Sequence, residues 1–179
     1  MIITISGVPG AGKTTVGKIL AKKLGYEFFS MGDIRGRIAK ERGLDINQLN
    51  KIGEKEDWTD RETDEYQKKL GKRNNIVVES RLAYHFIPHS VKIFLEVDPK
   101  TGAERVMKTE RDDERYESIE ETMEALEKRM ESDRKRYKKY YGIDFPDKSK
   151  FDLVIDTTDK TPEQVVNIIL DFIKNKYSS

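Results

Sequence analysis

Cysteine is absent from the 179 residues, so the chain forms no disulfide framework and offers no thiolate for catalysis. The two histidines, His85 and His89, have no metal-ligand partners at suitable spacing, and we interpret both as structural. Runs of about 18 apolar residues are also absent, and the first strand begins at residue 1 without a signal segment before it. We therefore expect a cytoplasmic protein that does not interact with a membrane.

An excess of one charge is lacking too, because 34 Lys and Arg residues are balanced by 33 Asp and Glu residues. Without a net field the protein has no general attraction for nucleic acid, so any basic site must be local. We expect no nucleic-acid partner, and we expect a monomer. The length suggests one domain, whose core is large enough to need no metal or disulfide support.

A glycine-rich segment is present at residues 7–14, Gly-Val-Pro-Gly-Ala-Gly-Lys-Thr, between an apolar strand and a helical pattern. This context is typical of a phosphate-binding loop, whose backbone N–H groups surround a polyphosphate at a helix N-terminus. Lys13 would reach the β- and γ-phosphates, and the Thr14 hydroxyl would bind Mg²⁺. The alternative is a glycine turn that serves tight packing only. The predicted ATP-binding residues of this segment are Gly7, Val8, Pro9, Gly10, Ala11, Gly12, Lys13, Thr14 and Thr15.

Five short β-type runs alternate with stretches of helical period, a pattern typical of a parallel α/β sheet. The strands are expected at residues 2–6, 27–30, 76–79, 91–97 and 151–156. The helices are expected at residues 13–24, 33–42, 59–73, 99–109, 119–141 and 162–175. Thr59 with Glu62 has the spacing of a capping box, and Thr161 before Pro162 is a second start signal.

Two connections, at about 31–75 and 99–149, are longer than a crossover requires, so each is expected to carry extra helices beyond the carboxyl edge of the sheet. Ligands of open α/β sheets bind at that edge. We predict a single domain with a core of 1–30, 76–98 and 150–179. The first insertion would bind an acceptor and the second would close over it as a lid.

The helix expected at 119–141 places Arg129, Asp133 and Arg136 within about 60° of one another, beside an apolar stripe. At this margin the three charges can point into a cleft above the sheet edge. The alternative is an exposed Arg129–Asp133 pair that stabilises the helix by a few tenths of a kcal/mol.

Three further motifs follow the phosphate-binding loop. A Gly-Asp pair at 32–33 follows the second strand, a Glu-Ser-Arg-Leu-Ala turn at 79–83 follows the third, and the long helix ends in Arg-Tyr-Lys-Lys-Tyr-Tyr-Gly-Ile-Asp at 136–144. This order resembles the short cytidylate kinase family over essentially the whole chain. The resemblance implies a five-stranded parallel sheet flanked by helices, as in P-loop nucleoside monophosphate kinases. It also implies that Arg129, Asp133 and Arg136 contact the acceptor sugar and phosphate.

Two positions depart from the pattern of that family. Ser80 stands where a glycine is usual, and Gly36 stands where an arginine is usual, with Arg35 and Arg37 on either side. Either of these arginines could therefore contact the acceptor phosphate.

The remaining candidates are polar residues at strand ends and in the insertions. Glu79 ends the third strand, where an acidic group lies near Mg²⁺ in many phosphotransferases, and its alternative role is a strand-end charge. Arg81 is expected to bind the acceptor phosphate bidentately. Asp33 either caps its helix or contacts the acceptor, and Asp60 and Arg61 are candidates for recognising the base.

Arg105 and Arg111 lie where a lid would supply positive charge to ATP, although the mixed charges at 108–115 also fit a solvated face. We assign Arg111 to the ATP site.

We therefore predict ATP-dependent phosphoryl transfer to a nucleoside monophosphate, CMP or dCMP, with Mg²⁺ as cofactor. The acceptor phosphate is already anionic, so no general base is required. The predicted catalytic residues are Lys13, Arg81, Arg129 and Arg136, and the metal-binding residues are Thr14 and Glu79. The predicted acceptor-binding residues are Asp33, Arg35, Arg37, Asp60, Arg81, Arg129, Asp133 and Arg136.

Three alternatives use the same loop. Adenylate or uridylate kinase activity would need the same residues, and a small-metabolite kinase would use Asp33 as base. A regulatory GTPase would need an Asn-Lys-x-Asp segment, which this sequence lacks.

Overall fold

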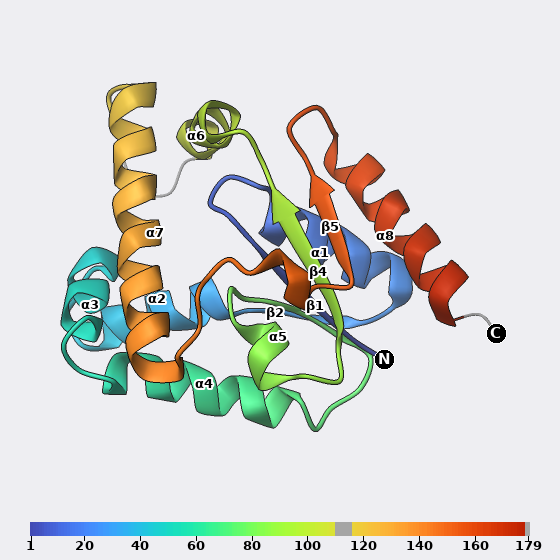
Figure 1. Cartoon of the computed structure of the whole chain (residues 1–179), viewed down its shortest axis with the longest axis horizontal. Coiled ribbons are helices and arrows are strands. Elements are labelled where there is room, and N and C mark those ends of the chain that lie inside the picture. Colours follow the sequence, from blue (N-terminus) through green and yellow to red (C-terminus); the bar gives the residue numbers. More distant parts are fainter. Residues whose placement is uncertain (110–115, 178–179) are drawn as a thin grey trace.

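The computed structural model describes residues 1–109 and 116–177 as a five-stranded sheet with helices on both faces (Figure 1). All neighbouring strands pair in parallel, in the order β2-β3-β1-β4-β5. The strands are β1 (Ile2–Gly7), β2 (Glu27–Ser30), β3 (Ile76–Glu79), β4 (Val91–Glu96) and β5 (Leu153–Asp156).

The helices fall into those that cover the sheet and those that extend beyond it. The first kind comprises α1 (Lys13–Leu24), α5 (Ala83–Phe86) and α8 (Pro162–Tyr177), with a short 3-10 turn at Lys148–Lys150. The second comprises α2 (Met31–Glu41), α3 (Ile46–Gly53), α4 (Trp58–Leu70), α6 (Pro99–Lys108) and α7 (Ile119–Tyr141).

The core lies on both faces of β1, which is buried along its whole length, as expected of a central parallel strand. Ile3 and Ile5 pack with residues of α1 and α8 on one face. Ile2 packs on the other face, in a cluster that includes Ala83 of α5 and Leu70 of α4. Alternation along the strand thus supplies apolar contacts to both helical layers.

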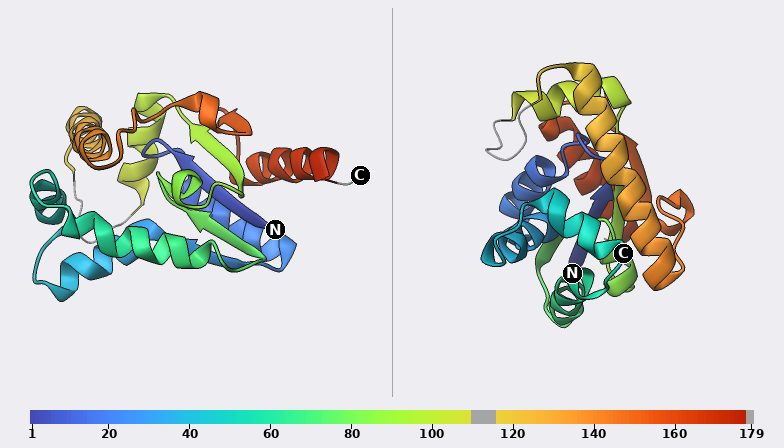
Figure 2. Two further views of the ribbon diagram at one scale, coloured as in Figure 1. Left: turned by 60° about the horizontal axis from the view of Figure 1, so that its bottom comes forward. Right: turned by 90° about the vertical axis from the view of Figure 1, so that its left-hand side faces the viewer.

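The helices α2–α4 and α6–α7 extend from the same end of the sheet as two groups (Figure 2, left). The long helix α7 runs from α6 near its N-terminal end to α3 near its C-terminal end (Figure 1). The carboxyl ends of the strands therefore face a space bordered by both groups. Within the described residues, no helix combines the length and apolar character needed to cross a membrane.

All five predicted strands and all six predicted helices are present, with ends that differ by up to three residues. Two helices were not predicted, α3 and the four-residue α5. The predicted capping box at Thr59 is wrong, because α4 begins at Trp58 and the Thr59 hydroxyl donates to Asp60 instead. The start signal at Thr161 is confirmed, since its hydroxyl accepts from the backbone N–H of Gln164.

Candidate active site

The glycine-rich segment forms a loop between β1 and α1. Gly10 and Gly12 have φ of 76° and 82°, a left-handed conformation that side chains disfavour. Gly10 also packs on α6, where a Cβ would lie 2.4 Å from the carbonyl oxygen of Gly102. The first turn of α1 contains no acidic side chain, so its positive dipole end stays available to an anion.

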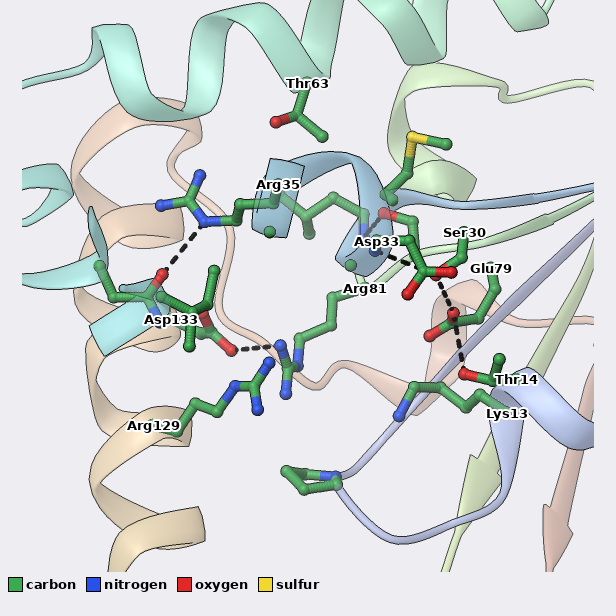
Figure 3. A pocket seen from close by; sticks show the side chains of 18 of the residues that line it. Lys13, Thr14, Ser30, Asp33, Arg35, Thr63, Glu79, Arg81, Arg129 and Asp133 are labelled. Atoms are coloured by element: carbon green, nitrogen blue, oxygen red, sulfur yellow. Dashed lines mark hydrogen bonds and ion pairs between the residues drawn. The ribbon is translucent and has the colours of Figure 1, made fainter. Parts of the chain in front are cut away.

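Beside this loop lies a small polar cluster at the end of β3 (Figure 3). Glu79 is only 8% exposed, and its Oε2 accepts hydrogen bonds from Thr14 Oγ1 at 3.2 Å and from Ser30 Oγ at 2.7 Å. Lys13 Nζ donates to the carbonyl oxygen of Val8 at 2.8 Å. A carboxylate and two hydroxyl groups thus lie together next to the loop.

A chain of ion pairs joins α7 to the acceptor-side helices. Asp133 Oδ2 pairs with Arg81 Nη1 at 2.7 Å, and its Oδ1 accepts from Arg136. Asp60 Oδ1 accepts from Arg136 Nη1 at 2.6 Å and from Arg35 Nη1 at 3.1 Å. Residues from α2, α4, α7 and the turn after β3 therefore meet in one buried network.

The arginines of this network outnumber its carboxylates and keep donor nitrogens without hydrogen-bond partners among the described residues. Burial works to raise the pKa of Asp133, but Arg81 and Arg136 outweigh it and hold the pKa below its usual value, so Asp133 is ionised. Three buried donor nitrogens, Arg35 Nη2, Arg81 Nε and Arg136 Nε, have no hydrogen-bond partner among the described residues. In these ion pairs the three guanidinium groups of Arg35, Arg81 and Arg136 face the two carboxylates of Asp60 and Asp133. Arg129 is also close enough to lower the pKa of Asp133.

The loop and the ion-pair network line the same cavity, of about 780 Å³. Of the predicted site residues, those lining it are Pro9, Gly10, Gly12, Lys13, Thr14, Thr15, Asp33, Arg35, Asp60, Glu79, Arg81, Arg129, Asp133 and Arg136.

The other predicted residues lie elsewhere. Gly7, Val8 and Ala11 belong to the loop without lining the cavity, and Arg37 and Arg61 are exposed away from it. Of the two candidate arginines of α2, the structure thus brings Arg35 to the cavity and leaves Arg37 outside. Arg111 lies outside the described residues.

Asp33 occupies the first turn of α2 and lines the cavity, but it does not cap the helix. Ser30 is the cap, since its Oγ accepts from the backbone N–H of Asp33 at 3.3 Å. The capping alternative for Asp33 is therefore wrong.

Several cavity residues were not predicted. Ser30 could have been found, because a serine directly before a helix is a standard cap. For Arg105 the sequence left open whether it binds ATP or lies on a solvated face. It lines the cavity and donates to the carbonyl oxygens of Thr157 and Thr158 at 2.7 and 3.0 Å. No local signal marked the others, which include Asn50, Thr63, Asp64, Gln67 and Tyr137.

Residues 2–159 match the model of the cytidylate kinase-like family, which confirms the resemblance carried by the motifs. A cytidylate kinase of Pyrococcus abyssi is 38% identical over 178 residues, covering 99% of this chain and 96% of that protein. A cytidylate kinase of Methanothrix thermoacetophila is 40% identical over 157 residues, 88% of each chain.

Among solved structures, the shikimate kinase of Aquifex aeolicus matches over 100% of both chains with a TM-score of 0.62 and 24% identity. At this identity the likeness concerns the fold alone, and it confirms the predicted P-loop kinase architecture.

Proposed function

This chain belongs to the cytidylate kinase-like family, and we propose that it transfers the γ-phosphoryl group of ATP to CMP or dCMP. The observation that carries the proposal is the buried network beside the phosphate-binding loop. The guanidinium groups of its ion pairs outnumber the carboxylates by three to two, which suits a phosphate monoester with about −1.5 to −2 charges at neutral pH. The three donor nitrogens without partners offer hydrogen bonds to phosphate oxygens.

ATP would bind on the loop, with its β- and γ-phosphates near Lys13 and the N-terminus of α1. The acceptor phosphate would bind at Arg81 and Arg35, across the cavity from the loop. An oxygen of that phosphate is already anionic, so the protein needs to supply alignment and positive charge rather than a base. Arg129 and Arg136 would stabilise the charge on the transferred group.

The cluster at Glu79 fits a magnesium ion. Mg²⁺ prefers oxygen ligands and takes only one or two carboxylates besides substrate phosphates and water. Glu79 and Thr14 offer a carboxylate and a hydroxyl 3.2 Å apart, directly beside the loop. When bound there with ATP, the ion would neutralise charge on the β- and γ-phosphate oxygens. We propose Thr14 and Glu79 as its protein partners.

The second candidate function is phosphorylation of a hydroxyl group on a small metabolite, in which Asp33 would act as the base. The unpartnered donor nitrogens of Arg35, Arg81 and Arg136 favour the phosphate acceptor, because several phosphate oxygens can satisfy them and a single hydroxyl group cannot. The monomeric state and the cytoplasmic location stay predictions.

A coupled assay with ATP and CMP, dCMP, UMP, AMP, GMP or shikimate tests the proposal. We expect CMP and dCMP to be the best acceptors. Lys13→Ala should lower kcat by roughly two to four decades, because Lys13 meets charge that develops during transfer. Lys18→Ala, an exposed change on the same helix, should leave kcat unchanged. Preference for shikimate, or near-normal turnover by Lys13→Ala, would contradict the proposal.

A further inference from the structure

The face of α4 that lines the cavity carries polar side chains, and these side chains take no part in the ion-pair network. Thr63 and Gln67 line the cavity and are 7% and 2% exposed. Thr63 Oγ1 and Gln67 Oε1 are buried and make no hydrogen bond within the described residues. Figure 3 shows Thr63 pointing from α4 toward the Arg35 side chain. Because buried polar atoms are nearly always paired, two such atoms on one cavity wall indicate a polar ligand.

Asp64 adds a charged acceptor to the same wall. It lines the cavity, and its Oδ2 accepts a hydrogen bond from the Tyr141 hydroxyl of α7. This contact fixes the direction of the carboxylate and leaves Oδ1 to a further donor. We call Thr63, Asp64 and Gln67 the α4 row.

The row begins one helical turn from the phosphate-binding network. Asp60, three residues before Thr63, is already bound by Arg35 and Arg136. Gln67 lies seven positions after Asp60, which corresponds to about 10 Å along the helix axis. A nucleotide whose phosphate lies at the arginines would extend its base toward the row.

We propose that the α4 row recognises the exocyclic amino group of the acceptor base and thereby selects cytosine over uracil. The inference rests on the proposed function. The amino group of cytosine has two N–H donors, which match Gln67 Oε1 and the carboxylate of Asp64. The Thr63 hydroxyl donates to the ring nitrogen beside it. Uracil presents a carbonyl oxygen in place of the amino group, and this oxygen would face the fixed carboxylate of Asp64 without a proton between them.

The test compares CMP with UMP and with the 5′-monophosphate of 2-pyrimidinone riboside, which lacks the amino group. The wild-type protein should prefer CMP to either analogue by about 10- to 100-fold in kcat/KM. Asp64→Asn and Gln67→Met should bring these ratios down toward one while the KM for ATP stays unchanged. Glu65→Gln, an exposed change on the same helix, should preserve the wild-type ratios.

The outcomes separate the two proposals. A wild-type protein that uses the amino-free nucleotide as well as CMP overturns the α4 assignment without any variant, while the proposed function stands. Equal losses on all acceptors in both variants also overturn it, because they indicate a structural role only. A wild-type protein that phosphorylates none of the monophosphates overturns the proposed function and the assignment that rests on it.

Discussion

Arg136 is a large side chain that is only 2% exposed, and it binds the carboxylates of Asp60 and Asp133 at the same time. Burying a guanidinium group is costly unless it is paired, so each partner in this network stabilises the others. Removing Arg136 would leave two buried carboxylates with fewer counter-charges. The residue is therefore expected to support the fold of the acceptor side as well as the acceptor phosphate.

Arg136→Ala should lower the free energy of unfolding by about 3–5 kcal/mol, the usual effect of breaking a buried ion pair. Arg134→Ala removes a neighbouring arginine whose side chain is 43% exposed and paired with Glu127. That control should cost about 1 kcal/mol or less. Urea denaturation measures both. Equal effects of the two changes on the free energy of unfolding would mean that the buried ion pairs of Arg136 do not stabilise the fold.

The carboxyl group of Asp64 should make the stability of the folded protein depend on pH. Burial raises its pKa to about 6 from an ordinary value of 3.8, against the opposing effect of the Tyr141 hydroxyl. The folded protein thus binds this proton more tightly than the unfolded chain, so ionised Asp64 destabilises the fold above pH 6. The penalty disappears as the pH falls from 6 to 3.8.

Asp64→Asn should therefore raise the Tm at pH 8, and the gain over wild type should shrink as the pH falls below 6. Asp57→Asn changes an exposed aspartate of the same region, whose pKa is lowered by its hydrogen bond with Arg61. This control should give no gain at pH 8. Thermal melts at several pH values test the prediction, and a gain from Asp64→Asn that did not vary with pH would contradict it.

Helix periodicity was enough to predict that Arg129, Asp133 and Arg136 share one strip of α7. It could not identify their partners. Asp60 lies 76 residues before Arg136 in the chain, and only the path of the two insertions brings them to hydrogen-bonding distance. Spacing along one helix records which residues share a face, whereas contacts between helices depend on packing.

At the scale of elements, the strands were predicted well because parallel strands are short apolar runs buried on both faces. Capping signals were less decisive. Asp45 and Gln48 form a capping box at the start of α3, which was not predicted. Thr59 and Glu62 have the same spacing and form none. Packing explains the difference. Gly53 of α3 lies so close to Thr59 that a Cβ at Gly53 would be 2.5 Å from Thr59 Oγ1. The Thr59 side chain is therefore packed against α3.

The contact between α6 and the phosphate-binding loop gives the element-scale prediction. A Cβ at Gly102 would lie 3.1 Å from the carbonyl oxygen of Pro9 and 3.0 Å from Val97 Cγ1. Gly102→Ala should therefore shift α6 against the loop and raise the KM for ATP by about 10-fold, since small misplacements at a reacting site are costly. The helix itself should gain up to about 1 kcal/mol.

Lys100→Ala, an exposed change on the same helix, is the control and should leave the KM for ATP unaltered. Steady-state kinetics with ATP varied at saturating CMP measure the effect. An unchanged KM for ATP in Gly102→Ala would show that the loop and α6 are not coupled through this contact.

At the scale of the molecule, the near-zero net charge of +1 still leaves room for a local excess of positive charge. The cavity brings five arginines and two lysines together with five carboxylates, so its cationic groups are the more numerous. The sequence predicted that any basic site would be local, and the cavity confirms it. The steering of anions should accordingly act near the cavity and weaken with salt.

The helix α7 connects the two insertions, because it packs on α6 at one end and on α3 at the other (Figure 1). Closure over both substrates should therefore engage the two groups together. An analogue that joins adenosine to cytidine through phosphates should protect amides of α2–α4 and α6–α7 from hydrogen exchange far more than those of β1 and β4, which are already buried. ATP alone is the control and should protect mainly the loop and α1. Equal protection of the sheet and the insertions would argue against closure, because a rigid cavity that binds ligand stabilises the whole fold by one common amount.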